Sequence, residues 1–342
     1  MDYLSESTRL LYAQLLSQCL HAAAPNGRGL SFVSKTIKGG THWYLQLTVG
    51  SQKTQHYLGP DSDAIQQLVT NEKKLWEDAK PDRQAREQLV TMLIAGGAQT
   101  VSAAEARLFE VIERAGVFLV GGVLVGSHAF AVFGNMLGIS WPSKMLQTHD
   151  VDIARDNHIA LGLRNEPANL KQALLAANMG FVEVPALNRK APSTRFRILG
   201  KQLSVDVLTP LIGKPMSKPI LISALNTYAE PLRFLDFLLE DTQSAVIVAR
   251  AGILVNVPSP ARYALHKLVT STRRPVAMQT KTIKDIDQAS LLFSVLLEDR
   301  PGDIPLAFEA AKRMPEKFIE QIKTGMRKLP ENIIEKLHLY TK

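Results

Sequence analysis

Hydrophobic and polar positions follow different periods along the first part of the chain. Leucines recur near helical spacing in residues 4–23, which predicts a helix. Residues 30–58 contain three short runs rich in β-branched and aromatic side chains, separated by KGG and GSQ, a pattern typical of a small antiparallel meander. Residues 62–94 predict a long helix broken near Pro81, and residues 102–115 predict the next helix.

From Val117 onward, strand-like and helix-like segments alternate. VFLVGGVLVG and HDVDIAR predict strands, and FVEV, RFRIL and QLSVDVLT are expected to join the same sheet. AFAVFGNML predicts a helix, and NLKQALLAANMG predicts another that is closed by Gly180. Short strands are expected around 244–257. A C-terminal bundle is then predicted from helices at 259–272, 284–297, 303–313 and 315–326.

These elements predict an α+β protein. It has a mixed sheet with helices, a small N-terminal β-meander with helices, and a C-terminal helical bundle. A chain of 342 residues suits two or three domains. We divide it into an N-terminal domain of residues 1–98, a central sheet domain of residues 99–225, and a mostly helical domain of residues 226–342.

Composition supports a globular protein, with 46% hydrophobic and 21% charged residues. Residues 115–143 contain no charged side chain and are long enough to span a bilayer. However, this stretch is rich in glycine and runs directly into a pair of carboxylates, so we interpret it as a buried strand and helix and expect no membrane partner. The single cysteine, Cys19, and an N-terminus without a secretion signal predict a cytoplasmic protein.

The chain carries a formal net charge of +8 and a pI of about 9.5. Such a charge either keeps the protein in solution or attracts a polyanion such as RNA, DNA or a nucleoside triphosphate. Basic residues gather in 262–284, where no acid precedes Asp285. This segment is a candidate phosphate-facing surface.

Carboxylates carry the main candidate chemistry. In HDVDIAR, Asp150 and Asp152 are two residues apart, so both point to one face of a strand while the intervening apolar residues enter the core. Their mutual repulsion calls for a cation, and hard oxygen ligands suit magnesium. Asp206 in QLSVDVLTP repeats the pattern. If the two strands are neighbours, the three carboxylates can hold two metal ions roughly 3.5–4 Å apart.

A glycine–serine turn precedes these acids. In LVGSHAF, an apolar strand leads through Gly126 and Ser127 into a helix, whose free N–H groups can bind phosphate. The alternative is a small-residue turn without a ligand. Gly121–Gly122, five residues earlier, is a rival position for the turn. We prefer Gly126–Ser127 because GVLVG has the composition of a strand.

The order of glycine–serine turn, helix, DxD strand and later acid-bearing strand resembles the DNA polymerase β-like nucleotidyltransferases. The string GGVLVGSHAFAVFGNMLGISW…THDVDIA…LSVDVLTP is especially similar to a bacterial family of nucleotidyltransferase-fold proteins of unassigned substrate, over about residues 100–290. The resemblance implies that Asp150 and Asp152 bind two Mg²⁺ ions, or Mn²⁺. It also implies that Asp206 joins the metal site and helps activate the acceptor, and that Gly126 and Ser127 bind the triphosphate. The gap from Gly126 to Asp150 is longer than in the superfamily and predicts an insertion.

Two basic residues, Lys267 and Arg195, each have more than one interpretation. By resemblance, Lys267 reaches the triphosphate; otherwise it is a solvated helix lysine. Arg195 either neutralises the carboxylates or binds phosphate, or else lies with Arg197 on a solvated strand face. Asp285 and its neighbour Asp287 are interpreted as acids at a helix N-terminus.

Two histidines flank the acids in sequence, His128 and His149, and we give neither a catalytic role. The basic and aromatic side chains of the meander could contact nucleic acid, but packing against the long helix is favoured.

The leading hypothesis is metal-dependent transfer of a nucleoside monophosphate from an NTP to a hydroxyl of RNA or tRNA, a protein or a small molecule, with a toxin as one version. The alternative is a nucleic-acid-binding or regulatory protein that keeps the fold without catalysis. A magnesium-dependent nuclease is a third reading, since clustered acids also suit hydrolysis.

Overall fold

A computed structural model describes residues 2–22, 30–37, 40–49, 52–146, 148–156, 168–186, 191–214 and 218–340, and all structural statements concern these residues. The predicted α+β class is confirmed, since the chain combines a mixed sheet with helices on its flanks. The hydrophobic core is continuous from the sheet into the C-terminal helices.

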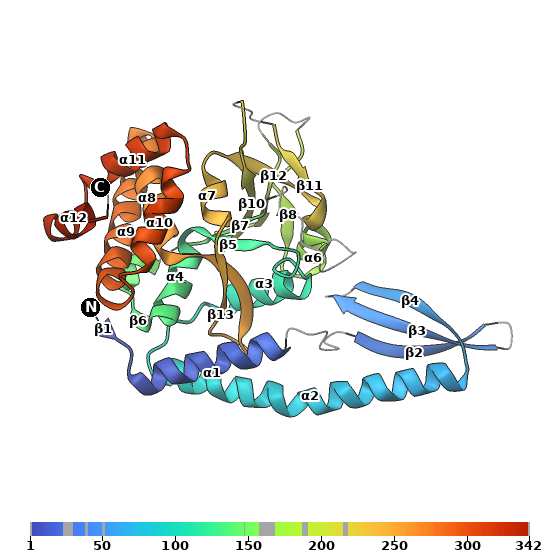
Figure 1. Cartoon of the computed structure of the whole chain (residues 1–342). Coiled ribbons are helices and arrows are strands. Elements are labelled where there is room, and N and C mark those ends of the chain that lie inside the picture. Colours follow the sequence, from blue (N-terminus) through green and yellow to red (C-terminus); the bar gives the residue numbers. More distant parts are fainter. Residues whose placement is uncertain are drawn as a thin grey trace.

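A mixed sheet of seven strands forms the centre of the described molecule (Figure 1). Its main path runs β11-β12-β10-β7-β5, and β9 pairs with β10 and β8 with β9. β7 and β12 are parallel to β10, whereas the pairings of β5, β8, β9 and β11 are antiparallel. The bounds are β5 Val123–Val125, β7 Asp150–Ala154, β8 Phe181–Glu183, β9 Arg195–Ile198, β10 Ser204–Pro210, β11 Ile220–Ile222 and β12 Thr227–Leu232.

FVEV, RFRIL and QLSVDVLT therefore lie in the sheet of HDVDIAR, as predicted. The proposed domain boundary at 225–226 falls between β11 and β12, two strands that pair with each other. The apolar run before Gly126 contributes only three residues to the sheet, because residues 115–121 form turns that end α3.

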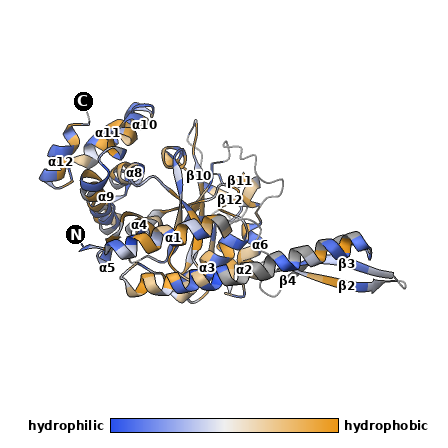
Figure 2. Ribbon diagram, turned by 60° about the horizontal axis from the view of Figure 1, so that its bottom comes forward, coloured by the Kyte–Doolittle hydropathy of each residue, from blue (hydrophilic) through white to orange (hydrophobic). Residues whose placement is uncertain are grey.

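The helices around the sheet come from both halves of the chain. Those of the first half are α1 Glu6–Ala22, α2 Asp63–Ala95, α3 Ala103–Arg114, α4 Gly126–Leu137, α5 Ser143–Leu146 and α6 Leu170–Ala176. Those of the second half are α7 Leu235–Leu239, α8 Pro260–Arg273, α9 Gln279–Asp299, α10 Asp303–Lys312, α11 Glu316–Met326 and α12 Glu331–His338, with short 3₁₀ turns at Ser223–Leu225 and Val276–Met278. In Figure 2 hydrophobic and hydrophilic residues alternate along these helices, as expected for elements with one buried face.

The predicted meander is confirmed and stands apart from the main body. β2 Leu30–Ile37, β3 Gly40–Val49 and β4 Gln52–Pro60 form an antiparallel sheet of their own. Figure 1 shows this sheet extending away from the body beside the first part of α2. Trp43 Nε1 donates a hydrogen bond of 2.8 Å to Asp61, so the meander is fastened where α2 begins.

Two smaller pairings complete the strands. β13 Thr242–Ile247 and β14 Ile253–Pro258 form the hairpin expected around 244–257. β1 Asp2–Tyr3 pairs with β6 Ile139–Ser140, so the first residues of the chain are joined to the insertion between α4 and β7.

Three sequence-based expectations were wrong. α2 continues through Pro81, because a proline removes one backbone hydrogen bond and long helical segments on both sides can absorb the loss. α6 ends at Ala176 rather than at Gly180, since Asn178 adopts the left-handed conformation (φ 52°) first. α9 begins at Gln279, so Asp285 is an interior residue of the helix and not a capping acid.

No helix in the described ranges is both long and apolar enough to cross a lipid bilayer. The uncharged segment 115–143 instead supplies β5 and α4, whose side chains belong to the main hydrophobic core.

Candidate active site

Three carboxylates lie on one face of the central sheet. β7 and β10 are parallel neighbours, and their register places Asp152 beside Asp206 and Asp150 beside Ser204. The alternate residues, Val151 and Ile153 in β7 and Val205 and Val207 in β10, are fully buried on the other face. The period of two seen in the sequence is therefore what brings the acids together.

Gly126 forms the wall of the site next to Asp152. Val125, the last residue of β5, is opposite Asp152 in the antiparallel pairing of β5 with β7. Gly126 has a positive φ of 67°, and a Cβ at this position would collide with Asp152 Oδ2. α4 begins at Gly126, so the strand–helix junction lies at Gly126–Ser127 and not at the rival Gly121–Gly122.

The first turn of α4 leaves backbone donors without helical partners next to these acids. Val125 offers no side-chain cap, and Ser127 is half-buried. The sequence thus brings Gly126 and Ser127 to the edge of the carboxylate cluster.

Crowding of the acids alters their protonation. Burial, together with Asp206 and Asp150, raises the pKa of Asp152 from 3.8 to about 7. Burial likewise raises the pKa of Asp206 to about 6, with Arg195 acting in the opposite direction. Lys267 and Lys281 lower these two pKa values, at Asp152 and Asp206 respectively, so α8 and α9 bring positive charge toward the sheet.

Arg195 bridges the cluster from β9. Its Nη2 lies 3.0 Å from Asp150 Oδ1 and its Nε 3.0 Å from Asp206 Oδ1. Ser204 Oγ also donates to Asp150 Oδ1 at 2.6 Å. Arg195 therefore pairs with two of the carboxylates, although its side chain remains exposed on the strand face. Arg197 is exposed.

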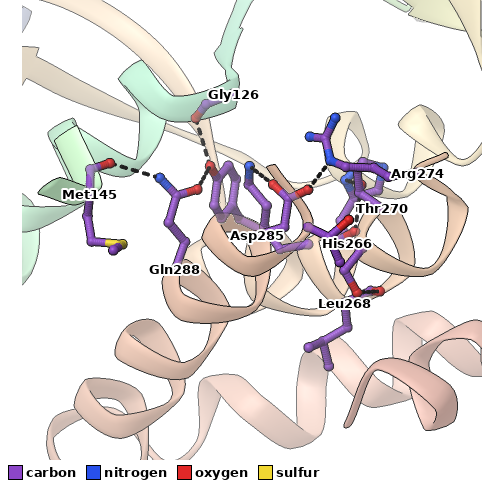
Figure 3. A network of polar contacts seen from close by, with 12 residues as sticks. Gly126, Met145, His266, Leu268, Thr270, Arg274, Asp285 and Gln288 are labelled. Atoms are coloured by element: carbon purple, nitrogen blue, oxygen red, sulfur yellow. Dashed lines mark hydrogen bonds and ion pairs between the residues drawn. The ribbon is translucent and has the colours of Figure 1, made fainter. Parts of the chain in front are cut away.

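Lys267 is not a solvated lysine. Its side chain is buried and its Nζ donates to Asp285 Oδ1 at 2.7 Å (Figure 3). Arg274 also contacts Asp285, on the second carboxylate oxygen. The interpretation of Asp285 as a capping acid is therefore wrong. Asp285 is a buried counter-ion for two basic residues of the 262–284 segment, the buried Lys267 and the partly exposed Arg274.

His128 holds three elements together. Its Nδ1 lies 3.1 Å from the carbonyl oxygen of Asp150, and its Nε2 lies 3.1 Å from Glu105 Oε1 of α3. Although burial would raise the pKa of Glu105, hydrogen bonds from His128 and Ser102 lower it to about 2. Glu105 also closes the capping box of α3 with Ser102, so this histidine has a structural role.

Some residues around the site were missed in the sequence. Ser204, which donates a hydrogen bond to Asp150, lies on the same strand face as Asp206 two residues later, so strand alternation could have identified it. Tyr263 precedes Lys267 by one helical turn, and its hydroxyl donates to the carbonyl oxygen of Gly126 at 2.8 Å. Nothing in the local sequence links Tyr263 with a turn 137 residues away.

The acids can take part in a metal site, but they do not form a cage as they stand. Within the described parts of the chain, no three His, Cys, Asp or Glu side chains are arranged to hold a metal ion. Mg²⁺ at phosphate-transfer sites typically uses only one or two protein carboxylates, and substrate phosphates and water supply the rest. Asp152 and Asp206, adjacent in register and raised in pKa, fit that pattern.

These pKa values predict that the metal-free protein loses stability as the pH rises. Asp152 and Asp206 hold protons in the folded state up to a pH of about 7 and 6, whereas the unfolded chain releases them near 3.8. Their contribution is therefore complete below pH 4 and is lost on passing through pH 6–7. Thermal unfolding in EDTA at pH 5 and pH 8 measures the change, and Asp152→Asn/Asp206→Asn should reduce it. An identical change in both proteins would contradict the assignment.

Comparison with known proteins agrees with this geometry. Residues 104–312 match the model of a family described as nucleotidyltransferase, which spans the central sheet and most of the C-terminal helices. The chain belongs to this nucleotidyltransferase family. Searches of curated proteins and of solved structures gave no match.

Proposed function

We propose that the protein transfers a nucleoside monophosphate from an NTP to a hydroxyl group and releases pyrophosphate, with Asp150, Asp152 and Asp206 as the metal-binding carboxylates. The observation that carries the proposal is the register of β7 and β10, which sets Asp152 beside Asp206 next to the Gly126 turn. The family membership supports the reaction class.

Two Mg²⁺ ions, or Mn²⁺ in their place, are the proposed cofactors. When bound, such ions neutralise the charge of the triphosphate and help to activate the attacking hydroxyl. In the metal-free structure Arg195 supplies positive charge to Asp150 and Asp206. Arg195 is therefore proposed to exchange these carboxylates for a phosphate oxygen of the nucleotide, which its planar guanidinium suits.

The proposed phosphate contacts come from the first turn of α4. The backbone N–H groups at Gly126 and Ser127 and the Ser127 hydroxyl are available as donors at the positive end of the helix dipole. Lys267 adds positive charge close to Asp152 while remaining paired with Asp285. We therefore propose that it acts on the triphosphate through its charge.

RNA, including tRNA, is the acceptor that the net charge of +8 favours. A protein side chain is the second proposed class of acceptor, and a toxin that modifies either one is a version of the same reaction.

The experiment incubates the purified protein with Mg²⁺ and each labelled NTP, alone and with total bacterial RNA or cell lysate. Asp150→Asn/Asp152→Asn is the inactive control. Glu320→Gln makes the same carboxylate-to-amide change on the exposed side of α11 and should behave as wild type. The proposal is supported if wild type and Glu320→Gln both transfer label to a macromolecule and the double variant transfers none. The labelled macromolecule then identifies the acceptor class.

Other outcomes have defined meanings. If nucleotide is consumed by neither wild type nor the double variant, transfer is contradicted and a non-catalytic nucleic-acid-binding role is supported. Release of mononucleotides from RNA without NTP would support a nuclease instead.

A further inference from the structure

A tyrosine of the C-terminal helices holds the glycine turn of the sheet. Tyr263 on α8 is fully buried, and its hydroxyl donates to the Gly126 carbonyl oxygen at 2.8 Å (Figure 3). The Oε1 atom of Gln288 on α9 lies 3.3 Å from the same hydroxyl. Gln288 Nε2 in turn donates to the carbonyl oxygen of Met145 in α5, at 3.2 Å. Two helices remote in sequence thus form hydrogen bonds with the glycine turn and with the insertion that follows it.

The bond to Gly126 has a consequence for the next amide. The carbonyl of Gly126 and the N–H of Ser127 belong to one planar, trans peptide group and point in opposite directions. A partner that fixes the carbonyl therefore fixes the N–H as well. Ser127 N–H is among the first donors of α4, which lack partners within the helix.

The same glycine is flexible in isolation. Gly126 is held at a φ of 67° and lies directly against the Asp152 carboxylate. Because glycine has the widest choice of backbone conformations, a contact from outside α4 adds to the helical bonding in keeping this peptide in one orientation. Tyr263 provides that contact from the side of the C-terminal helices.

A buried ion-pair network keeps the tyrosine in place. The Lys267 ammonium lies over the Tyr263 ring, 5.2 Å from its centroid, and is itself anchored by Asp285. Burial raises the pKa of Tyr263 to about 12, so the hydroxyl keeps its proton and remains a donor at working pH.

We infer that Tyr263 is a positioning residue that orients the Ser127 amide for the nucleotide phosphates through its hydrogen bond to the Gly126 carbonyl. This inference rests on the proposed function, because it assigns a task to a turn that the proposal places against the triphosphate. The roles are distinct: Tyr263 acts through the peptide group and does not itself touch the nucleotide.

The test compares Tyr263→Phe with Tyr12→Phe. Tyr12 is also buried, and its hydroxyl bonds with the backbone of Val246 in a separate hydrophobic cluster, so both variants lose one buried hydroxyl. Binding of MgATP, MgGTP, MgCTP and MgUTP is measured by calorimetry. Tyr263→Phe should raise the Kd of the preferred nucleotide about five- to tenfold, the loss expected for one hydrogen bond. Tyr12→Phe should leave this Kd unchanged, although the two variants should lose similar thermal stability.

Amide hydrogen exchange measured without nucleotide reports on the turn itself. Exchange at Phe130, whose N–H pairs with the Gly126 carbonyl in the first turn of α4, should be faster in Tyr263→Phe than in wild type and unchanged in Tyr12→Phe. Gln288→Leu keeps Tyr263 and removes its second partner, so it should show the same change to a smaller extent, and it serves if Tyr263→Phe does not fold.

The outcomes separate the two proposals. If wild type binds none of the four nucleotides, the proposed function fails, and hydrogen exchange still tests the hold on the turn. If wild type binds a nucleotide and Tyr263→Phe matches it in both affinity and exchange, the positioning role is overturned. Equal weakening by Tyr12→Phe would also overturn it, since the effect would then be a general loss of stability.

Discussion

Replacing Asp152 by asparagine is expected to lower the rate of nucleotidyl transfer by roughly 10²–10³-fold and to leave the chain folded. Asparagine keeps the size of the side chain but removes the negative charge that a cation needs. Asp152 is the acid in closest contact with the Gly126 turn and lies beside Asp206.

Folding should survive this change for an electrostatic reason. Burial and neighbouring acids raise the pKa of Asp152 to about 7, so the folded metal-free protein already disfavours its charge. Removing the charge should hold or raise the melting temperature in EDTA. Initial rates with saturating Mg²⁺ and NTP, together with melting curves, check both parts. Activity above about a tenth of wild type, or a marked loss of melting temperature, would contradict a metal-binding role for Asp152.

Replacing Asp285 by alanine is expected to destabilise the protein by about 3–5 kcal/mol, because it leaves a buried lysine without its counter-ion. Asp285 is almost fully buried and bonds with both Lys267 and Arg274. Burial alone would lower the pKa of Lys267, but Tyr263 and Asp285 raise it, so the lysine is charged in the folded protein. Arg274 is partly exposed and can turn toward water, whereas Lys267 is not free to do so.

Urea unfolding at pH 7 measures this loss. Lys267→Met in the Asp285→Ala background should recover part of the stability, since the uncompensated charge is then gone. Glu309→Ala serves as the control, because its ion pair with Lys312 is largely exposed and should contribute less than about 1 kcal/mol. A double variant less stable than Asp285→Ala alone would show that the charge is not the cause.

The sequence predicted that the three acids share one face of the sheet, because strand alternation is a local property. Asp152 and Asp206 lie between apolar residues and Asp150 precedes one, so the strand period alone puts the acids of each strand on the face opposite the buried valines and isoleucine. Their proximity also depended on β7 and β10 being neighbours. The sequence alone leaves that adjacency open, and the sheet order shows that the two strands are neighbours.

What the sequence could not supply were contacts between distant segments. Whether Lys267 lies in solvent or in an ion pair depends on α9 packing against α8, and the start of α9 was placed five residues too late. With that boundary, Asp285 looked like a first-turn acid. The hydrogen bond from Tyr263 to Gly126 likewise connects two elements whose local patterns carry no sign of each other.

Local propensity also failed where long-range packing or helix length decided the outcome. Pro81 lies inside a helix of 33 residues, long enough on both sides to tolerate one missing bond. β11 and β12 were not predicted, and they extend the sheet beyond the acid-bearing strands.

The length of α2 determines how far the meander extends from the main body. With 33 residues rising about 1.5 Å each, the helix is about 50 Å long, and it begins beside the meander and ends against the core formed with α1. Because α2 carries the meander outward beside its first part, a polymeric acceptor such as a folded RNA or another protein offers β2–β4 more surface to contact than a mononucleotide does.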